Sequence, residues 1–309
     1  MKIAVGVDAG GSSTTAVASV NGKIGQPVTG GPANIATDFD TAVNVLHDVI
    51  TRAASQGPLD AVVIGAAGAG SPNIASRLET ALRQTKQFAT YIEVCQDTTI
   101  ALRAAIPEGD GIVVIAGTGS IAYAEIDGER YRSGGYGYVF GDEGSGFAIG
   151  CAAVQYMLRA EDGRVARDRF VEDIARAVRV LGKGEGGSMG MRAIVRKMYS
   201  EQNPVPGIAS LASLVIAFAD GGERSAQRIV QKAAFDLGEL VKSLMQPGMA
   251  DREIPLVFAG GLLRKNSLLT YLLETRLSND FPFIRIIKNG LEPHFGALRL
   301  AERGAGRTC

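Results

Sequence analysis

The sequence of 309 residues contains no tryptophan, two histidines and three cysteines. Cys95, Cys151 and Cys309 lie far apart, form no CxxC pair and are odd in number, so a reducing compartment, the cytoplasm, is the expected location. His47 and His294 stand apart from other residues that could hold a metal. We therefore expect no zinc site, and we expect structural or surface roles for both histidines.

The sequence also lacks an excess of charge, because 32 lysines and arginines balance 32 acidic residues. Without a basic excess no nucleic-acid partner is expected, and the substrate should be small. The longest interior uncharged stretch, 202–219, falls short of the roughly 20 apolar residues that span a bilayer, so we expect a buried helix there. The first predicted strand follows residue 1 directly and leaves no room for a signal peptide, so no membrane partner is expected.

Glycine, in contrast, is abundant at 40 residues, while hydrophobic residues make up 46% of the chain. This combination predicts tight turns and close backbone contacts rather than disorder. The length allows one large or two ordinary domains, and we expect two.

The most informative glycines follow the first predicted strand, in the stretch 5–15 (VGVDAGGSSTT). Gly10 and Gly11 can adopt the positive φ of tight turns and, lacking Cβ, they let backbone N–H groups approach a phosphate. The hydroxyl donors that follow are Ser12, Ser13 and Thr14. Asp8 would repel phosphate by itself, so its position indicates a hydrated divalent cation between carboxylate and phosphates. An ordinary Gly-Gly hairpin is the alternative.

The pattern of strand, glycine turn and strand recurs at 112–124, where Gly119 falls on Gly11 of the first stretch. Each stretch closes at an Asx-Gly dipeptide, at 21–22 and at 127–128, which is a strong hairpin signal. The recurrence indicates an internal repeat at the scale of a domain. Two such units facing each other would form a cleft with phosphate donors on both walls.

Hydrophobic periodicity and breakers predict the other elements. Strands are expected at 24–29, 61–66, 91–95, 254–259 and 283–287. Helices are expected at 39–56, 73–84, 97–105, 143–159, 168–181, 191–200, 208–219, 223–246, 262–277 and 293–303, with 182–190 as a glycine-rich connector.

Five motifs in one order carry a family resemblance that covers nearly the whole chain. They are 7–12 (VDAGGS), 31–34 (GPAN), 96–97 (QD), 115–120 (IAGTGS), and 134–137 (GGYG) leading to 141–145 (GDEGS). In this combination the sequence resembles the sugar kinase, Hsp70 and actin superfamily of ATPases. Within it, the sequence is most similar to the N-acetylglucosamine and glucosamine kinases grouped with the BadF/BadG/BcrA/BcrD ATPases.

The resemblance implies an α/β fold of two ribonuclease-H-like, actin/hexokinase-type domains facing a cleft, each a mixed five-stranded sheet flanked by helices. The N-terminal ATPase lobe would comprise 1–108 with the closing helix 293–304, and the C-terminal ATPase lobe 109–292. The implied activity is an amino-sugar kinase that uses ATP and Mg²⁺, held through water at Asp8, to phosphorylate the 6-hydroxyl of N-acetylglucosamine or glucosamine. A homodimer is expected.

By this resemblance Asp97 is the catalytic residue, which accepts the proton of the sugar hydroxyl as that oxygen attacks the γ-phosphorus. The alternative is that Asp97 only caps the helix that follows it. The family usually has Thr-Asp-Ala or Asn-Asp-Ala here, whereas this chain has Gln96 and Thr98 around the acid.

The same resemblance assigns Gly117, Thr118 and Gly119 to a second phosphate-binding wall. Gly260 and Gly261 would lie under the adenosine, where a side chain would collide with the nucleoside. For both segments the alternative is an ordinary tight turn.

The residues that match amino-sugar ligands in the resembling kinases are Asn34, Asp97, Gly135, Tyr136, Gly137 and Asp142. Asn34 offers a donor and an acceptor, and Asp142 accepts from hydroxyls. An Asx-turn at Asn34 and a helix cap at Asp142 are the alternatives. Because Tyr136 stands where the family often has tryptophan, the choice between glucosamine, its N-acetyl form and another amino sugar stays open.

Two other functions are kept as alternatives. A BadF-type ATPase that activates a reductase or dehydratase would need closely placed cysteine ligands for an iron–sulfur cluster, which this sequence lacks. A sugar-responsive regulator on a kinase scaffold would need a helix-turn-helix module, and none precedes the first strand.

Overall fold

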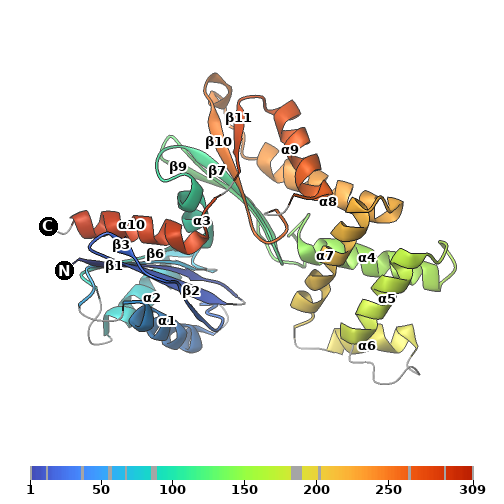
Figure 1. Cartoon of the computed structure of the whole chain (residues 1–309), viewed down its shortest axis with the longest axis horizontal. Helices are drawn as coiled ribbons and strands as arrows, with labels where there is room; N and C mark the ends of the chain where they lie inside the picture. The colour runs from blue at the N-terminus through green and yellow to red at the C-terminus, as the bar shows by residue number, and fades with distance from the viewer. Residues whose placement is uncertain are drawn as a thin grey trace. The chain divides into compact units, whose positions relative to one another are not determined.

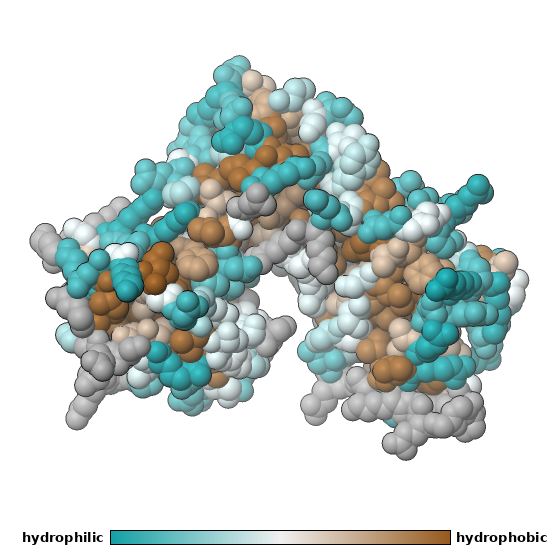
Figure 2. Space-filling view, in the orientation of Figure 1, coloured by the Kyte–Doolittle hydropathy of each residue, from teal (hydrophilic) through white to brown (hydrophobic). Residues whose placement is uncertain are grey.

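The computed structural model shows an α/β protein (Figure 1). The chain forms two compact units, residues 1–113 with 287–309, and residues 114–286, which are described separately. The residues described are 2–11, 13–35, 38–54, 58–66, 68–84, 89–181, 190–200, 203–263, 266–288 and 290–307. Figure 2 shows hydrophilic residues, in teal, on the visible surface of each unit.

The first unit is built on a mixed sheet of six strands in the order β3-β2-β1-β5-β6, with β4 also paired to β2. The strands are β1 (Ile3–Ala9), β2 (Thr14–Val20), β3 (Lys23–Ile24), β4 (Val28–Gly30), β5 (Ala61–Ala66) and β6 (Tyr91–Gln96). β2 runs antiparallel to β1, whereas β1, β5 and β6 are parallel. The predicted strand 24–29 forms as two pieces, β3 and β4, and Pro27 between them has no N–H to donate to a ladder. This split gives six strands where five were expected.

Helices cover both faces of this sheet. They are α1 (Phe39–Ala54), α2 (Pro72–Gln84), α3 (Asp97–Ala105) and α10 (Pro293–Arg307). The core between the sheet and α1 and α2 includes Leu46 and Ile64. On the opposite face Ile100 of α3 and Leu298 of α10 are buried against the sheet. This alternation follows from the period of two in the strands, which sends successive side chains to opposite faces.

The last helix, α10, approaches the sheet closely because glycines stand at the crossing points. A Cβ at Gly6 of β1 would lie 2.0 Å from the backbone N of Leu298, and a Cβ at Gly296 would lie 1.9 Å from the carbonyl O of Ile100 in α3. Only residues without a Cβ allow the three elements to pack at this separation.

The second unit contains a sheet of five strands in the order β11-β10-β7-β8-β9. The strands are β7 (Gly111–Ala116), β8 (Ser120–Ile126), β9 (Glu129–Gly134), β10 (Ile254–Ala259) and β11 (Ile284–Ile287). The chain passes from the first unit to the second within β7, after Val113. It returns to the first unit at Ile287, the last residue of β11. β9 was not among the predicted strands, and it pairs antiparallel with β8 from Glu129 to Gly134.

The helices of the second unit are α4 (Gly146–Glu161), α5 (Arg169–Leu181), α6 (Met191–Ser200), α7 (Val205–Asp220), α8 (Arg224–Lys242) and α9 (Leu268–Asp280), with a 3-10 turn at Met249–Asp251. Two of them begin later than predicted because a serine caps each. The Ser145 hydroxyl accepts from the Ala148 N–H at 3.1 Å, so α4 begins at Gly146 rather than 143. Ser267 forms a capping box with Thr270, so α9 begins at Leu268 rather than 262. The predicted connector 182–190 lies outside the described residues except for Gly190.

Residues 205–219 of the uncharged stretch lie in α7, whose residues Leu211, Val215 and Ala219 are buried. The expected helix is present, and one side of it is buried. No single described helix is long and apolar enough to cross a bilayer, and α7 meets that test only together with α8, as a pair bent by 115°.

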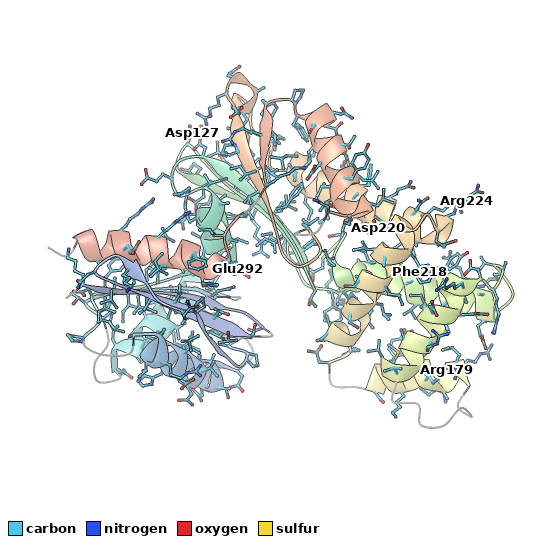
Figure 3. All side chains as sticks on the ribbon, viewed as in Figure 1. Asp127, Arg179, Phe218, Asp220, Arg224 and Glu292 are labelled. Atoms are coloured by element: carbon cyan, nitrogen blue, oxygen red, sulfur yellow. The ribbon has the colours of Figure 1, made fainter. Side chains whose placement is uncertain are left out.

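The two Asx-Gly dipeptides form the predicted hairpin turns. Asn21 and Gly22 have φ of 49° and 81°, and Asp127 and Gly128 have φ of 53° and 80°. Positive φ at both central residues is the type I′ turn, which matches the twist of the flanking strands. Asp127 (Figure 3) also forms an ion pair with Arg252 at 2.7 Å.

The contact at Gly296 predicts that Gly296→Ala destabilises the protein. The added methyl group would overlap the Ile100 carbonyl, so we expect the free energy of unfolding to fall by about 2 kcal/mol or more. Gly306 in the same helix is the matched control, because a Cβ there meets nothing within 4 Å. Gly306→Ala should leave stability unchanged or raise it by up to about 1 kcal/mol. Equal unfolding midpoints in denaturant for both variants would contradict the close packing of α10.

Candidate active site

The first glycine loop connects β1 to β2 and is closed by its own backbone. The Gly10 N–H donates to the Ser13 carbonyl O at 3.0 Å, and the last strand pair joins Ala9 to Thr14. Neither Gly10 nor Gly11 has a positive φ, so the loop does not use this freedom of glycine. Glycine is needed at position 10 for space instead, because a Cβ there would lie 2.9 Å from the Ser13 carbonyl O. Ser12 lies outside the described residues.

The loop is tied to the segment that carries Asn34. The Ala33 N–H donates to the Gly10 carbonyl O at 3.1 Å. The Asn34 Nδ2 atom is 3.9 Å from the place a Cβ on Gly11 would occupy. Thr14 is fully buried, and its Oγ1 forms no hydrogen bond within the described structure. Predicted phosphate and sugar ligands are therefore adjacent in this unit.

Asp8 and Asp97 lie at one edge of the first sheet. Asp8 is in register with Gly65 of β5, and Gly65 is in register with Cys95 of β6. Asp97 follows directly after Gln96, the last residue of β6. Neighbouring strands are about 4.8 Å apart, so β1 and β6 are separated by roughly 10 Å. Gly65 on the strand between them makes room for Ile100 of α3, because a Cβ at position 65 would lie 2.3 Å from the Ile100 Cδ1 atom.

Asp97 is the first residue of α3 and is partly buried. Its Oδ1 accepts from the Thr98 backbone N–H at 2.9 Å, and the cap position belongs to Gln96, whose side chain makes no capping bond. A carboxylate in the first turn is stabilised by the positive end of the helix dipole. Asp97 therefore lies at the sheet edge, in the first turn of α3, without serving as the helix cap.

The second glycine loop, 117–119, joins β7 to β8 and is anchored to the start of α4. The Gly117 N–H donates to the Gly119 carbonyl O at 2.9 Å. The carbonyl oxygens of Gly117 and Thr118 accept from the N–H groups of Gly146 at 2.7 Å and Phe147 at 3.2 Å. Thr118 itself is exposed. The loop therefore presents Thr118 to solvent while its carbonyls are already paired.

The glycine pair after β10 packs against the end of β7. Gly260 has φ of 84°, and a Cβ there would lie 2.3 Å from the Ala116 carbonyl O. The Leu262 N–H donates to the same oxygen at 3.1 Å. A Cβ on Gly261 would meet nothing within 4 Å. Gly260 is thus required by the fold, and Gly261 leaves open space beside the second loop.

Asp142 lies against the second loop in an unusual backbone conformation. Its φ is 58°, and its carboxylate is 2.9 Å from the place a Cβ on Gly119 would occupy. Burial raises the pKa of this carboxyl above its usual value, against the lowering effects of backbone hydrogen bonds from Ser120 and Gly137. Positive φ is strained for a residue with a side chain. The contacts join the predicted sugar segment to the predicted phosphate loop.

The glycines of the predicted sugar segment have the positive φ that glycine favours, 68° at Gly135 and 88° at Gly137. Tyr136 between them is 75% exposed. Arg132 was not identified from the sequence, yet its guanidinium donates to the Gly135 carbonyl O at 2.5 Å. Little in the sequence indicated Arg132, since this residue precedes the 134–137 motif and lies on β9, a strand that periodicity did not predict.

The other residues considered from the sequence lie elsewhere. His294 is buried in α10 with its ring 4.4 Å from that of Phe295, and His47 is partly buried in α1. Cys95 is on β6 of the first unit, and Cys151 is on α4 of the second, where burial raises the pKa of its thiol. No group of three or more histidine, cysteine or acidic residues suited to a metal occurs among the described residues.

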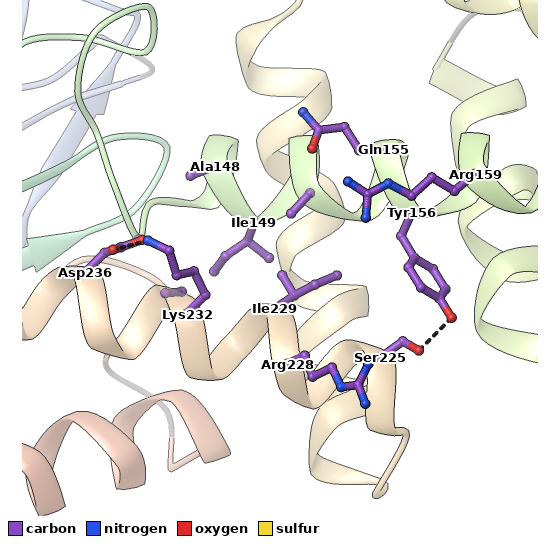
Figure 4. Close-up of a pocket in the computed structure, with 13 residues that line it drawn as sticks. Ala148, Ile149, Gln155, Tyr156, Arg159, Ser225, Arg228, Ile229, Lys232 and Asp236 are labelled. Carbon is purple, nitrogen blue, oxygen red and sulfur yellow. Dashed lines mark hydrogen bonds and ion pairs between the residues drawn. The ribbon is translucent and has the colours of Figure 1, made fainter. Parts of the chain in front are cut away.

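A separate cavity of about 370 Å³ lies between α4 and α8 (Figure 4). A hydrogen bond of 2.7 Å joins the hydroxyls of Tyr156 and Ser225 in its wall, and Lys232 forms an ion pair with Asp236. Gly144 also lines it, but none of the predicted site residues is among its described lining. The cavity is therefore distinct from the predicted loops.

Comparison with known proteins gives one consistent result. The N-acetylmuramic acid/N-acetylglucosamine kinase of Clostridium acetobutylicum is 30% identical over 310 residues, which cover 97% of this chain and 98% of that protein. The glucosamine kinase of Vibrio cholerae is 32% identical over 169 residues, or 53% of this chain and 57% of that protein. The crystal structure of a candidate N-acetylglucosamine kinase from Chromobacterium violaceum matches with a TM-score of 0.77 and 24% identity, over 97% of this chain and 99% of that one.

The structural match confirms the fold class predicted from the sequence, an α/β fold of the actin/hexokinase type with mixed sheets flanked by helices. Residues 5–301 match the BadF/BadG/BcrA/BcrD ATPase family. Since that match and the relative from Clostridium acetobutylicum both extend over nearly the full length, the resemblance noted in the five motifs is a true relationship. The chain belongs to the BadF/BadG/BcrA/BcrD ATPase family.

Proposed function

We propose that this chain is an ATP-dependent kinase that transfers the γ-phosphate to the 6-hydroxyl of an amino sugar, N-acetylglucosamine or glucosamine. The observation that carries the proposal is the position of Asp97 at the start of α3, on the same sheet edge as Asp8. The names of the relatives support it, because they are kinases of N-acetylglucosamine, N-acetylmuramic acid and glucosamine.

In this proposal Asp97 is the general base. Its carboxylate takes the proton of the 6-hydroxyl while the sugar oxygen forms a bond to the γ-phosphorus and the bond to the leaving ADP breaks. A single carboxylate is sufficient, because phosphoryl transfer depends mainly on in-line positioning and on neutralising charge at the phosphate oxygens.

The two glycine loops bind the nucleotide. We assign the phosphates to Gly10, Gly11, Ser12, Ser13 and Thr14 of the first loop and to Gly117, Thr118 and Gly119 of the second. Gly11, Ser13 and Thr118 are exposed, as a phosphate ligand must be, whereas the buried Thr14 side chain is suited to shaping the loop. The adenosine lies on Gly260 and Gly261, where the missing side chain at Gly261 leaves open space.

Asp8 is suited to hold Mg²⁺ through water. Mg²⁺ keeps several waters and takes one or two carboxylates together with substrate phosphates, so a single partly buried acid beside the phosphate loop fits its needs. When bound, the ion neutralises negative charge on the phosphate oxygens. Asp8 then acts by orienting the hydrated ion toward the loop.

The sugar is assigned to Asn34, Asp97, Gly135, Tyr136, Gly137 and Asp142. Asn34 lies beside the first loop, and Asp142 lies against the second. Asn34 offers a donor and an acceptor to a pair of hydroxyls, and Asp142 offers acceptors. The exposed Tyr136 ring provides a flat apolar surface for the sugar.

The proposal divides the work between an N-terminal ATPase lobe, 1–108 with the closing helix 293–304, and a C-terminal ATPase lobe, 109–292. In this proposal the protein is a homodimer in the cytoplasm. The rival reductase-activating function is disfavoured, because the two described cysteines, Cys95 and Cys151, belong to separate elements and offer no set of cluster ligands.

A coupled assay of ADP release tests the proposal directly. The sugars are glucosamine, N-acetylglucosamine, N-acetylmannosamine, N-acetylmuramic acid and glucose, each with ATP and Mg²⁺. We expect release with at least one amino sugar well above release without sugar. ADP release that is independent of every sugar would favour an ATPase function, and no release at all would favour a regulator.

Asp97→Asn should lower kcat by about 100-fold or more, because the amide cannot accept the proton of the attacking hydroxyl. Calorimetric titration should show sugar and nucleotide binding close to that of the unchanged protein. A near-normal kcat would remove Asp97 from the mechanism, and loss of sugar binding would make it a ligand only.

Thr118→Val should raise the KM for ATP while sugar binding stays nearly unchanged, since an isosteric methyl group replaces a hydroxyl donor at the phosphates. Thr118→Ser is the matched control, because it keeps the hydroxyl and should keep most of the nucleotide affinity. If the two variants have the same KM for ATP as the unchanged protein, the second loop is only a turn.

A further inference from the structure

Arg132 holds the backbone of the predicted sugar segment. It lies near the end of β9, and its Nε donates to the Gly134 carbonyl O at 3.2 Å and its Nη2 to the Gly135 carbonyl O at 2.5 Å. The guanidinium carbon is 5.5 Å from the centroid of the Tyr136 ring. The cation is therefore fixed beside the backbone and the ring that we assign to the sugar.

Arg132 retains donors for a further ligand. A guanidinium has five N–H groups in a planar fork, and the two contacts to carbonyl oxygens use two of them. The side chain is exposed, and no carboxylate in the described parts of the chain forms an ion pair with it. Its Nη1 side is thus available to an acceptor that comes from solution.

The other charged groups of this segment are acidic. Burial raises the pKa of Asp142, the charge of the neighbouring Glu143 raises it further, and the charge of Arg132 lowers it. Glu143 and Arg132 thus lie near enough to Asp142 for their charges to act on it in opposite directions. A ligand with its own carboxylate would be repelled by the two acids, and Arg132 is the group that offsets this repulsion.

We propose that Arg132 binds the carboxylate of an acidic amino sugar, so that the site accepts N-acetylmuramic acid as well as neutral N-acetylglucosamine. The inference rests on the proposed kinase function and names a substrate class for it. N-acetylmuramic acid carries a lactyl ether on the 3-hydroxyl of N-acetylglucosamine, and the lactyl carboxylate is the only charge that this group adds. A guanidinium fork matches a carboxylate with two parallel hydrogen bonds.

The simpler role for Arg132 is to hold Gly134 and Gly135 in place for any sugar. That role would affect charged and neutral sugars alike. The ratio of kcat/KM for N-acetylmuramic acid to kcat/KM for N-acetylglucosamine separates the two roles. A change in the position of the loop would lower both values by the same factor and leave the ratio unchanged.

The test compares Arg132→Gln and Arg132→Lys with the unchanged protein on three sugars: N-acetylglucosamine, N-acetylmuramic acid, and the methyl ester of N-acetylmuramic acid. The ester keeps the bulk of the lactyl group without its charge. For Arg132→Gln we expect the ratio to fall by roughly 10-fold or more, the effect of losing a charge-assisted pair. Arg132→Lys should restore part of the ratio. In Arg132→Gln, kcat/KM for the ester should fall by no more than kcat/KM for N-acetylglucosamine does.

Arg130→Gln is the matched control, because Arg130 is on the same strand, its side chain is 69% exposed, and the substitution removes the same charge. It should leave the ratio unchanged. An equal loss on all three sugars in Arg132→Gln would make Arg132 a structural residue and overturn the inference. The inference would also be overturned if the unchanged protein phosphorylated N-acetylglucosamine but not N-acetylmuramic acid. That result would leave the proposed kinase function intact. No turnover of any sugar would overturn both.

Discussion

The in-register parallel pairing of β1, β5 and β6 is the constraint on which the candidate site of the first unit depends. Parallel strands end at the same edge of a sheet, so residues far apart in sequence meet there without any contact between their side chains. Asp8, the loop after β1 and Asp97 are brought together in this way. Gly65 on the middle strand makes room for the Ile100 side chain of α3, and this contact explains why glycine is needed there.

The second unit depends on glycine contacts instead. Gly260 allows the turn after β10 to touch the end of β7, and the carbonyls of the 117–119 loop are fixed by the start of α4. Asp142 then joins this loop to the segment around Tyr136 in a conformation that few residues with a side chain adopt. Each unit thus positions its polar groups through contacts of the backbone.

Local signals in the sequence were the reliable ones. The turns at 21–22 and 127–128 and the helix from Asp97 were predicted correctly, because turn chemistry and periodicity act over a few residues. The fold class followed from ordered motifs. Gly10 and Gly11 do not use the positive φ that glycine can adopt, and glycine is needed at position 10 because a Cβ there would lie 2.9 Å from the Ser13 carbonyl O. Arg132 and β9 were missed because an alternation of exposed polar residues gives no hydrophobic pattern.

The close docking of α10 also determines when the first unit can be completed during synthesis. β1, β5 and α3 leave the ribosome early, but the helix that covers their shared face is the last element of the chain. Until it emerges, Ala4, Val63 and Ile100 lack the contacts that Ala297, Leu298 and Ala301 of α10 add to their cluster. Contacts of such long sequence separation form slowly and leave apolar surface open to association. Before α10 is made, the part of this apolar face that it covers is therefore exposed on the growing chain.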